Sequence, residues 1–577
     1  MFFHFTLDSS VLLLDTQTGV KELHRVDLRS ELHYDGIVPE PMKSTYDVIL
    51  VLPYPFADHP SFPEALLAAA LKQEGFRVGI LDVPHWQDER EFLRLGRPEL
   101  FFAIVPGPVD SLIMNYTPTL KRRREDLYQI HGGAYFPDSP PSAASRIRPD
   151  RCVITFANQI RKAWKDVMVI AGGMETSERI YAHYDLLQQR IRRSILLDAR
   201  LDLAVAGMGE LQICAVARGV AAGIPIGEMG IPGTAMIQSR KPPEADFEEL
   251  PAFDELTDHP AQLLRAYAVQ RSAAAAARGI CQRHNDRWVV RLPDAVYTGK
   301  DLDSIYNREY RRAHIGNQAM SPALTMNLFS ITSHRGCLGR CAFCAVCRIQ
   351  GGKVVSRSVE SILQEVDQIS HHPRWQGVVA DVGGATAEMY GMNSFKSPAG
   401  TAYLELLRRI RRHPAVRKVF TASGVRHDLM LKNPELLEEI MRFHSGSFLR
   451  VAPEHIHDEV LHYMGKPPFQ VFRDFCALFA EINRGLKRRV DLAAYIIIGH
   501  PGEEKRHIRD AGRVLRDLGV SRVDAQIFTP APGLLSTALF AAGMDERGNP
   551  VAVCRDKHEL ERRKAGIYAR SGSVEPA

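Results

Sequence analysis

The chain has 577 residues, 45% of them hydrophobic and 24% charged, and its formal net charge is +5. This length is too great for a single hydrophobic core, and the composition is that of a folded protein, so we expect at least two globular domains. The small positive excess does not indicate nucleic acid as a partner. No apolar run approaches the roughly 20 residues of a membrane span, and the first residues lack a signal-peptide pattern, so we predict a cytoplasmic protein with no membrane partner.

The first half of the chain alternates short apolar runs with helical patterns. Residues 1–45 show no sustained period and are treated as an N-terminal extension. From residue 46 a helix is expected at 63–74, and strands are expected at 47–52, 78–81, 101–105, 152–156, 167–171 and 203–206. Continuous apolar runs with helices between them are typical of a parallel, doubly wound sheet. Because glycines follow the last two strands, where such a sheet lines its ligand crevice, residues 46–230 are predicted to form a Rossmann-like domain.

The second half shows another alternation after a change in composition. Residues 231–320 contain a proline pair, an acidic stretch and an alanine run, and they predict a linker and helical bridge. Strands are then expected at 326–331, 377–382, 416–422, 448–452, 491–498 and 522–528, and helices at 358–370, 402–412, 434–443, 470–484 and 503–518. This α/β pattern predicts a partial (β/α)6 barrel over residues 321–545, with its chemistry at the carboxyl ends of the strands. Residues 546–577 are expected to be a C-terminal tail whose last twenty or so residues are frayed.

Four of the nine cysteines fall within eleven residues, directly after the first predicted barrel strand. Cys337, Cys341 and Cys344 form a C-x3-C-x2-C array, whose three thiolates can hold three irons of a [4Fe–4S] cluster and leave the fourth iron open. Zinc is the chief alternative, but a structural zinc site usually has four protein ligands, and no second pair lies at ordinary spacing. The array therefore predicts an iron–sulfur site.

The array, at the end of the first strand of a six-stranded partial barrel, resembles the radical S-adenosylmethionine (SAM) superfamily. The resemblance implies that the open iron binds SAM, and that an external donor of the flavodoxin or ferredoxin type reduces the cluster to release a 5′-deoxyadenosyl radical. Motifs at 381–386, 497–503 and 528–533 resemble the later strand ends of that barrel. Ala385 stands where an acidic residue is usual. The resemblance implies SAM contacts from Gly383 and Gly384. Because the length of SAM carries it from the open iron above strand one over the neighbouring strand ends, we also expect contacts from the backbone near Phe343 and from Ser423, Arg426 and Glu454.

Further segments resemble one branch, the YgiQ-type radical SAM proteins, in the same order from about residue 46 to about residue 554. They lie at 58–62, 192–198, 282–286, 422–426 and 452–455. The resemblance supplies neither the substrate nor the residues that act on it, so both stay unknown. We also expect the N-terminal domain to close over the barrel mouth, because an open six-stranded barrel leaves a gap and a radical must be shielded from solvent.

Two alternatives stay open. Strand-end glycines at 171–173 and 206–210 resemble the cobalamin-binding domain of radical SAM methyltransferases, but the D-x-H-x-x-G signature is missing, because Asp58 and His59 are adjacent. A cobalamin-dependent methyltransferase is therefore an alternative that we do not favour. Cys347 is a spare ligand, a reactive thiol or a small packing residue. As a fourth ligand it would favour a non-catalytic iron–sulfur protein that transfers electrons or stabilises an RNA or protein complex.

Overall fold

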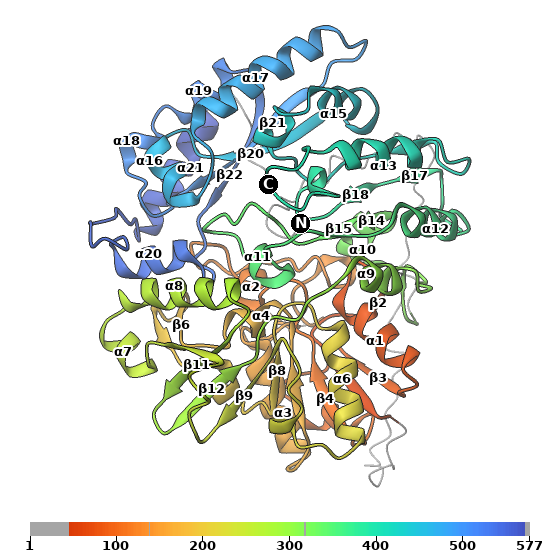
Figure 1. Cartoon of the computed structure of the whole chain (residues 1–577), viewed down its shortest axis with the longest axis vertical. Coiled ribbons are helices and arrows are strands. Elements are labelled where there is room, and N and C mark those ends of the chain that lie inside the picture. The colour runs from red at the N-terminus through yellow and green to blue at the C-terminus, as the bar shows by residue number, and fades with distance from the viewer. Residues whose placement is uncertain (1–45, 138, 317–318, 572–577) are drawn as a thin grey trace.

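The computed structural model describes residues 46–137, 139–316 and 319–571, so the expected extension at 1–45 lies outside the described residues. A lower part built on one large sheet and an upper part built as a barrel meet along a broad junction (Figure 1). Within the described ranges no helix is both long and apolar enough to cross a membrane.

The lower part contains a nine-stranded sheet in which five neighbouring strands at one end are parallel. In spatial order they are β3 (Val78–Asp82), β1 (Val48–Leu52), β4 (Phe101–Ile104), β5 (Val169–Ala171) and β8 (Leu203–Val205). Since β1 pairs with β3 on one side and β4 on the other, the strand order reverses direction between β1 and β4. This switch point is where sheets of this type bind ligands.

Helices cover both faces of this sheet, as the alternation along β1 requires. Ile49 and Val51 pack in the core shared with α3 (Cys152–Ala163). The other residues of β1 pack on the opposite face in the core shared with α1 (Pro63–Gln73) and α6 (Glu210–Ala221).

Residues 152–156, predicted to be a strand, form the start of α3 instead. Their apolar residues continue at helical spacing into the following segment, so that Cys152, Val153, Phe156, Ala157 and Ile160 are all buried on one side. A five-residue apolar run does not by itself distinguish a strand from a buried helix, and here the residues beyond the run decide.

The segment predicted to be a linker contributes four strands to the same sheet. Next to β8 lie β9 (Thr234–Gln238), β12 (Arg287–Arg291), β11 (Gly279–His284) and β10 (Phe247–Leu250). The pairs β8–β9, β9–β12 and β12–β11 are antiparallel. The segment also contains the helices α7 (Phe253–Asp258), α8 (Gln262–Ala275), which includes the start of the alanine run, and α9 (Gly299–Tyr306). Most of residues 231–291 therefore extends the N-terminal sheet.

The upper part is an open barrel of six parallel strand positions. β14 (Ser330–Thr332) pairs with β18 (Asp381–Gly383), and β17 (Val378–Val379) pairs with β19 (Lys418–Val419). A bridge between Val425 and Val451 links this half to three parallel strands, β20 (Phe448–Glu454), β21 (Asp491–Ile498) and β22 (Val520–Ile527). β14 and β22 do not pair with each other, so the barrel is open between its first and last strands. The predicted partial (β/α)6 barrel is confirmed.

Helices surround the barrel strands and complete its core. They are α12 (Val359–Ser370), α13 (Thr401–Arg411), α15 (Pro434–Glu439), α16 (Asp458–Met464), α17 (Phe469–Arg484), α19 (Ala511–Asp517) and α20 (Leu535–Ala542). Strand one begins later than predicted, because α10 (Pro322–Asn327) occupies residues 326 and 327. The predicted frayed end is wrong for most of its length: α21 (Lys557–Ser571) buries Ile567 and Tyr568 against the barrel, and the Tyr568 hydroxyl accepts a hydrogen bond of 3.0 Å from Ala525 N.

Candidate functional site

The cysteine-bearing loop leaves the barrel directly after strand one and is closed at its base. β15 (His334–Arg335) pairs with β16 (Val355–Ser356), so residues 336–354 form a loop whose two ends lie side by side. Gly336 has φ +88°, and a Cβ at this position would lie 1.9 Å from the Lys353 carbonyl oxygen. Only glycine allows the two ends of the loop to approach this closely.

The three cysteines of the array lie on this one loop at the carboxyl end of β14. Cys337 is buried, while Cys341 and Cys344 are half-buried. Gly339 N donates to Cys337 Sγ at 3.3 Å, and Arg426 Nη1 lies 3.8 Å from Cys341 Sγ. Within the described residues no three Cys, His, Asp or Glu side chains converge closely enough for a single metal ion. The cysteine sulfurs that hold a [4Fe–4S] cluster lie farther apart than the ligands of a single ion, because each thiolate binds its own iron.

Cys347 lies on α11 (Val346–Gln350), one turn beyond the array. Its Sγ donates to the Cys337 carbonyl oxygen at 3.0 Å, and its thiol also interacts with the Cys337 side chain. The interaction with the Cys347 thiol, the N–H of Gly339 and the charge of Arg426 lower the pKa of Cys337. The Cys347 thiol therefore lies against the backbone of Cys337.

The glycine pair at the end of strand two lies against strand one and strand three. Thr332 pairs with Gly383, so the two strand ends are adjacent. A Cβ on Gly384 would lie 2.5 Å from the His334 ring, and a Cβ on Gly383 would lie 2.4 Å from Ser423 Oγ. Close packing therefore accounts for both glycines, and it brings the backbone of strand two beside the base of the cysteine loop.

Ser423, after strand three, is hydrogen-bonded to Asp381 on strand two. Its hydroxyl donates to Asp381, and its backbone N donates to the same carboxylate at 3.0 Å. Asp381 also accepts from Ala422 N at 2.8 Å, and burial raises the pKa of Asp381. The hydroxyl proton of Ser423 is thus committed to Asp381, so that a ligand could use only the lone pairs of this oxygen.

Arg426 and a carboxylate that the sequence did not single out lie together at the mouth. Arg426 reaches the cysteine loop, and its guanidinium pairs with Asp428 at 2.9 Å. Its backbone N donates to Glu388 Oε1 at 2.9 Å. Glu388 is fully buried on a short turn, its second oxygen has no hydrogen-bond partner in the described chain, and burial raises its pKa to about 7. Glu388 stands three residues after Ala385, and this spacing was the only available signal for it.

Glu454 and Phe343 lie at the other strand ends. Glu454 ends β20 with φ +70°, a left-handed conformation that costs a non-glycine residue about 1–3 kcal/mol and is common at functional sites. Lys466 Nζ lies 3.9 Å from Glu454 Oε1. The Phe343 ring packs edge-on at 6.1 Å against the ring of His500, which follows strand five. Since the strands are parallel, all six residues proposed for SAM belong to one edge of the barrel.

A buried ion pair joins the base of the cysteine loop to the N-terminal domain. Arg335 Nη2 lies 2.8 Å from Glu210 Oε1, and both side chains are at most 5% exposed. Arg335 Nε also donates to the Tyr306 hydroxyl at 3.0 Å. Although burial alone would raise it, the pKa of Glu210 is lowered because Arg335 stabilises its carboxylate. A Cβ on Gly207 would lie 2.9 Å from the Ile349 carbonyl oxygen, so the two domains touch at backbone level here.

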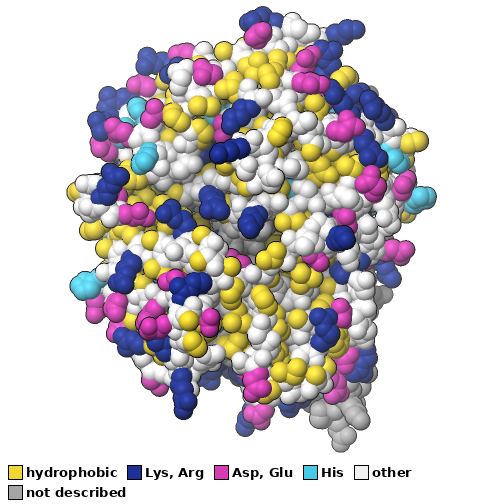
Figure 2. Space-filling view, in the orientation of Figure 1, with side chains coloured by type: hydrophobic (Ala, Val, Ile, Leu, Met, Phe, Trp, Pro, Cys, Tyr) yellow, Lys and Arg dark blue, Asp and Glu magenta, His cyan; other side chains and the backbone are white. Residues whose placement is uncertain are grey.

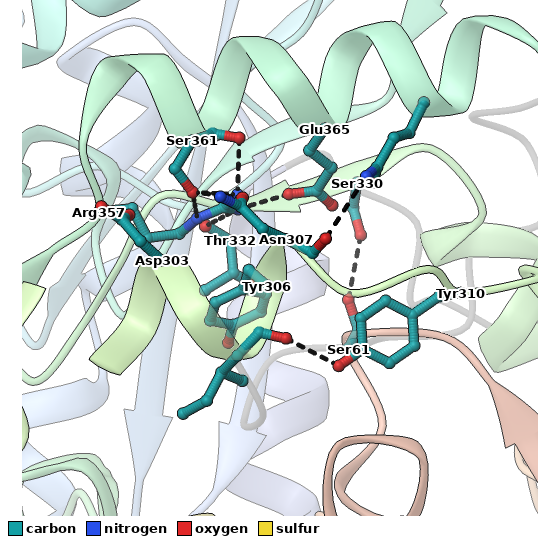
Figure 3. Close-up of polar contacts among 12 residues, drawn as sticks. Ser61, Asp303, Tyr306, Asn307, Tyr310, Ser330, Thr332, Arg357, Ser361 and Glu365 are labelled. Carbon is teal, nitrogen blue, oxygen red and sulfur yellow. Dashed lines mark hydrogen bonds and ion pairs between the residues drawn. The ribbon is translucent and has the colours of Figure 1, made fainter. Parts of the chain in front are cut away.

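The second strand of the loop base is anchored in the same way (Figure 3). Arg357, which follows β16, donates to Glu365, to Ser361 Oγ and to the carbonyl oxygen of Thr332 at the end of β14. Its guanidinium lies 4.7 Å from the centre of the Tyr306 ring. In the space-filling view the molecule is hollowed at the junction of the two parts, with Lys and Arg side chains around the hollow (Figure 2). Arg335 and Arg357 therefore anchor both strands at the base of the loop.

Comparison with known proteins gives consistent matches over most of the chain. The model of the radical SAM N-terminal family matches residues 39–330, and that of the radical SAM superfamily matches residues 331–515. A UPF0313 protein of Methanosarcina acetivorans is 35% identical over 96% of this chain and 82% of its own length, and UPF0313 protein GSU2873 of Geobacter sulfurreducens is 36% identical over 90% and 89%. The structure of the radical SAM methyltransferase TsrM from Kitasatospora setae, with cobalamin and a [4Fe–4S] cluster bound, aligns with a TM-score of 0.52 at 16% identity, over 92% of this chain and 89% of that one. This last likeness concerns the fold.

Proposed function

Because this chain belongs to the radical SAM superfamily and, within it, to the UPF0313 proteins, we propose that it cleaves SAM reductively at a [4Fe–4S] cluster held by Cys337, Cys341 and Cys344 and then modifies a substrate by hydrogen abstraction. The observation that carries the proposal is the placement of the three thiols on one closed loop at the carboxyl end of strand one, with Arg426 beside them. The chain is an enzyme, and as a radical SAM enzyme it needs both a substrate and a source of electrons.

The residues around the thiols fit a negatively charged cluster. The N–H of Gly339 and the guanidinium of Arg426 both point at cysteine sulfurs, and hydrogen bonds to sulfur are one means by which proteins set cluster potentials. When bound and reduced, the cluster supplies the electron that divides SAM into methionine and a 5′-deoxyadenosyl radical. The other five cysteines lie scattered along the sequence, outside the array. We therefore assign the electron to an external donor of the flavodoxin or ferredoxin type.

We assign SAM to the edge formed by Phe343, the pair Gly383-Gly384, Arg426 and Glu454, with Ser423 as a lone-pair acceptor. Glu388 completes this set. Its unpartnered oxygen gives the site a buried carboxylate in place of the acidic residue that is missing at Ala385, and a carboxylate suits the ammonium group of SAM. The fixed loop base at Arg335 and Arg357 keeps the cysteines in register with this edge.

The crevice in which a Rossmann-like domain binds its ligand is filled in this chain, which favours chemistry without cobalamin. The switch point lies beyond the carboxyl ends of β1 and β4. There Gln129 Nε2 donates to the Pro53 carbonyl oxygen at 2.7 Å, and Arg148 Nη1 donates to the Pro106 carbonyl oxygen at 2.7 Å. Both side chains are buried, and Arg148 also pairs with Asp126 at 2.9 Å.

Aromatic residues pack at the same point. The Arg148 guanidinium lies 5.1 Å from the Tyr54 ring centre and 5.8 Å from that of Tyr128. A Cβ on Gly107 would lie 2.7 Å from the Tyr54 ring. This buried network at the switch point supports a cobalamin-free reading, so we place the N-terminal domain among the parts that shield the barrel and hold the substrate.

One assay tests the proposal. Anaerobically reconstituted protein, incubated with SAM and dithionite, should form 5′-deoxyadenosine, and Cys341→Ala protein should not. Added methylcobalamin should leave the products unchanged. S-adenosylhomocysteine that appears only with methylcobalamin would overturn the cobalamin-free proposal, and protein that forms neither product while holding a full cluster would overturn the enzymatic one.

A further inference from the structure

The segment that carries the cysteine loop has charges of one sign only. Residues 310–359 contain seven Lys or Arg residues and no Asp or Glu. The basic residues occur at about the density of the whole chain, whereas 68 acidic residues in 577 would place about six in a segment of this length. The lack of carboxylates is therefore the unusual feature, and the basic groups of this segment can find a counter-charge only elsewhere in the fold.

Three buried basic groups of this segment do find such a counter-charge. Arg312 Nη2 lies 2.5 Å from Glu365 Oε1, and Arg357 contacts the other oxygen of the same carboxylate. Arg335 Nη2 lies 2.8 Å from Glu210 Oε1. The three basic side chains are at most 5% exposed, and a buried charge that lacks a partner is costly to a fold. The fold thus supplies a carboxylate to each of these three groups.

The exposed basic groups of the cysteine loop have no such partner. Arg340 and Lys353 are exposed, and neither forms an ion pair within the described residues. The third basic residue of the loop, Arg348, is half-buried and donates to Gln270 Oε1 at 2.8 Å and to the Gly533 carbonyl oxygen at 3.0 Å. The loop therefore presents positive charge to solvent that no ion pair of the described chain offsets.

Arg340 reaches across the loop to the segment that carries Lys353. A Cβ on Gly352 would lie 3.1 Å from Arg340 Nη2, so the guanidinium packs against the residue before Lys353. We call Arg340 and Lys353 the basic rim. In Figure 1 the loop, marked by α11, lies on the viewed face at the junction of the two parts, where Figure 2 shows Lys and Arg side chains around a hollow.

The basic rim is adjacent to two of the proposed cluster ligands. Arg340 directly precedes Cys341 in the chain. At the other end of the loop, Cys337 N donates to the Gly351 carbonyl oxygen at 3.2 Å, two residues before Lys353. A protein bound at the rim would therefore lie against the backbone that carries the ligands.

We propose that the basic rim is the docking surface for the electron donor, and that this donor is a small one-electron carrier protein whose own surface is acidic. In the complex the carrier loses one electron and the cluster gains it, so the step needs no further reactant. Such encounters bury less than about 1,200 Å², and complementary charge raises rates of association by about 10- to 10³-fold. The inference deepens the proposed function and rests on it, because it presupposes the cluster on this loop.

Two exposed cations suit a carrier protein better than they suit a nucleic acid. Proteins that bind nucleic acids gain affinity by neutralising several phosphates at once, and the whole chain has a net charge of only +5. A small anion is the other occupant that two cations could hold, and its effect would not depend on which reductant is supplied. The choice of reductant therefore separates a carrier from an anion.

The first measurement is binding, which does not depend on turnover. Oxidised flavodoxin, or a ferredoxin as second probe, is titrated into the reconstituted full-length protein by calorimetry at about 10 mM and about 1 M salt, where charges are screened over about 30 Å and about 3 Å. At low salt the double variant Arg340→Gln, Lys353→Gln should bind at least about tenfold more weakly than wild type. At high salt the two proteins should bind equally weakly.

The second measurement varies the reductant. With a limiting amount of reduced carrier at low salt, the double variant should form 5′-deoxyadenosine at least about fivefold more slowly than wild type, whereas with dithionite the two rates should be equal. The matched control, Arg484→Gln with Lys487→Gln, also removes two exposed positive charges. These lie at the end of α17 and in the turn before β21, at the amino ends of the barrel strands, so the control should match wild type in both assays.

Circular dichroism and iron content check that each variant folds and holds its cluster, and if the double variant fails either check, Lys353→Gln alone should lose about threefold in carrier affinity. Equal carrier binding by variant and wild type, an equal loss in the control, or a wild type that binds neither carrier would refute the docking surface. A loss with dithionite as well would assign the two side chains to the cluster or to a small anion, and would also refute it. Absence of 5′-deoxyadenosine from wild-type protein with dithionite would instead contradict the proposed function.

Discussion

The ion pair between Arg335 and Glu210 should contribute far more to stability than an exposed pair of the same chemistry. Glu210→Gln removes the negative charge and leaves the guanidinium of Arg335, a residue that is 4% exposed, without its counter-charge two residues before Cys337. Breaking a buried pair from one side costs about 3–5 kcal/mol. Because Arg335 keeps its contact with the Tyr306 hydroxyl, we expect the lower end, about 3 kcal/mol.

The matched control is Glu74→Gln, which breaks the pair of Arg218 and Glu74 in the same domain. Their charged atoms are 2.7 Å apart, but the side chains are 54% and 40% exposed, so the cost should be at most about 1 kcal/mol. Urea unfolding followed by circular dichroism gives both free energies, and iron per chain after reconstitution should fall only in Glu210→Gln. Equal costs for the two substitutions, with equal iron content, would refute the argument that burial of this pair fixes the loop.

Three further predictions concern single side chains. Glu388→Gln should weaken SAM binding by about tenfold near pH 8. In the wild type the affinity for SAM should rise as pH increases through about 7, where the Glu388 carboxyl loses its proton. Equilibrium dialysis that shows the same pH profile in both proteins would contradict this. Cys347→Ser should retain about four irons per chain, because the Cys347 thiol already contacts the Cys337 carbonyl oxygen at 3.0 Å. Loss of one iron per chain on iron analysis would show that Cys347 is a ligand. Burial raises the pKa of Glu64 to about 7, so the native state holds this proton more tightly than the unfolded state, and stability should fall as pH rises from about 4.5 to about 7. Glu64→Gln should remove this decline and gain up to about 3 kcal/mol near pH 8, and urea unfolding that shows the same decline in the variant would exclude Glu64 as its source.

Regular barrel elements could be predicted from the sequence because their signals are local. The predicted strand at 491–498 coincides with β21, whose residues after Asp491 are all buried, and the predicted helix at 470–484 differs from α17 by one residue. The strands of residues 231–291 could not be predicted in the same way. They extend, mostly through antiparallel pairs, a sheet formed by distant residues, and nothing in their own composition indicates that partner.

The candidate site shows the same difference between local patterns and long-range contacts. The cysteine spacing is a local pattern and could be read directly. The positions of Glu388 at the barrel mouth and of Arg335 and Glu210 at the junction could not be predicted, because they depend on which strand ends the fold brings together. The filled crevice is a similar case. Gln129 and Arg148 lie in an irregular segment, and only the folded chain places them on carbonyl groups just beyond β1 and β4.

The most direct test of the account is the electron paramagnetic resonance spectrum of the reduced protein, recorded with and without SAM. Wild-type protein should contain about four irons per chain, and its cluster signal should shift when SAM is added, because three cysteines leave one iron open to the ligand. Protein with Cys337→Ala, Cys341→Ala and Cys344→Ala together should give no such signal. A full cluster signal in the triple variant, or a wild-type spectrum that SAM leaves unchanged, would contradict the account.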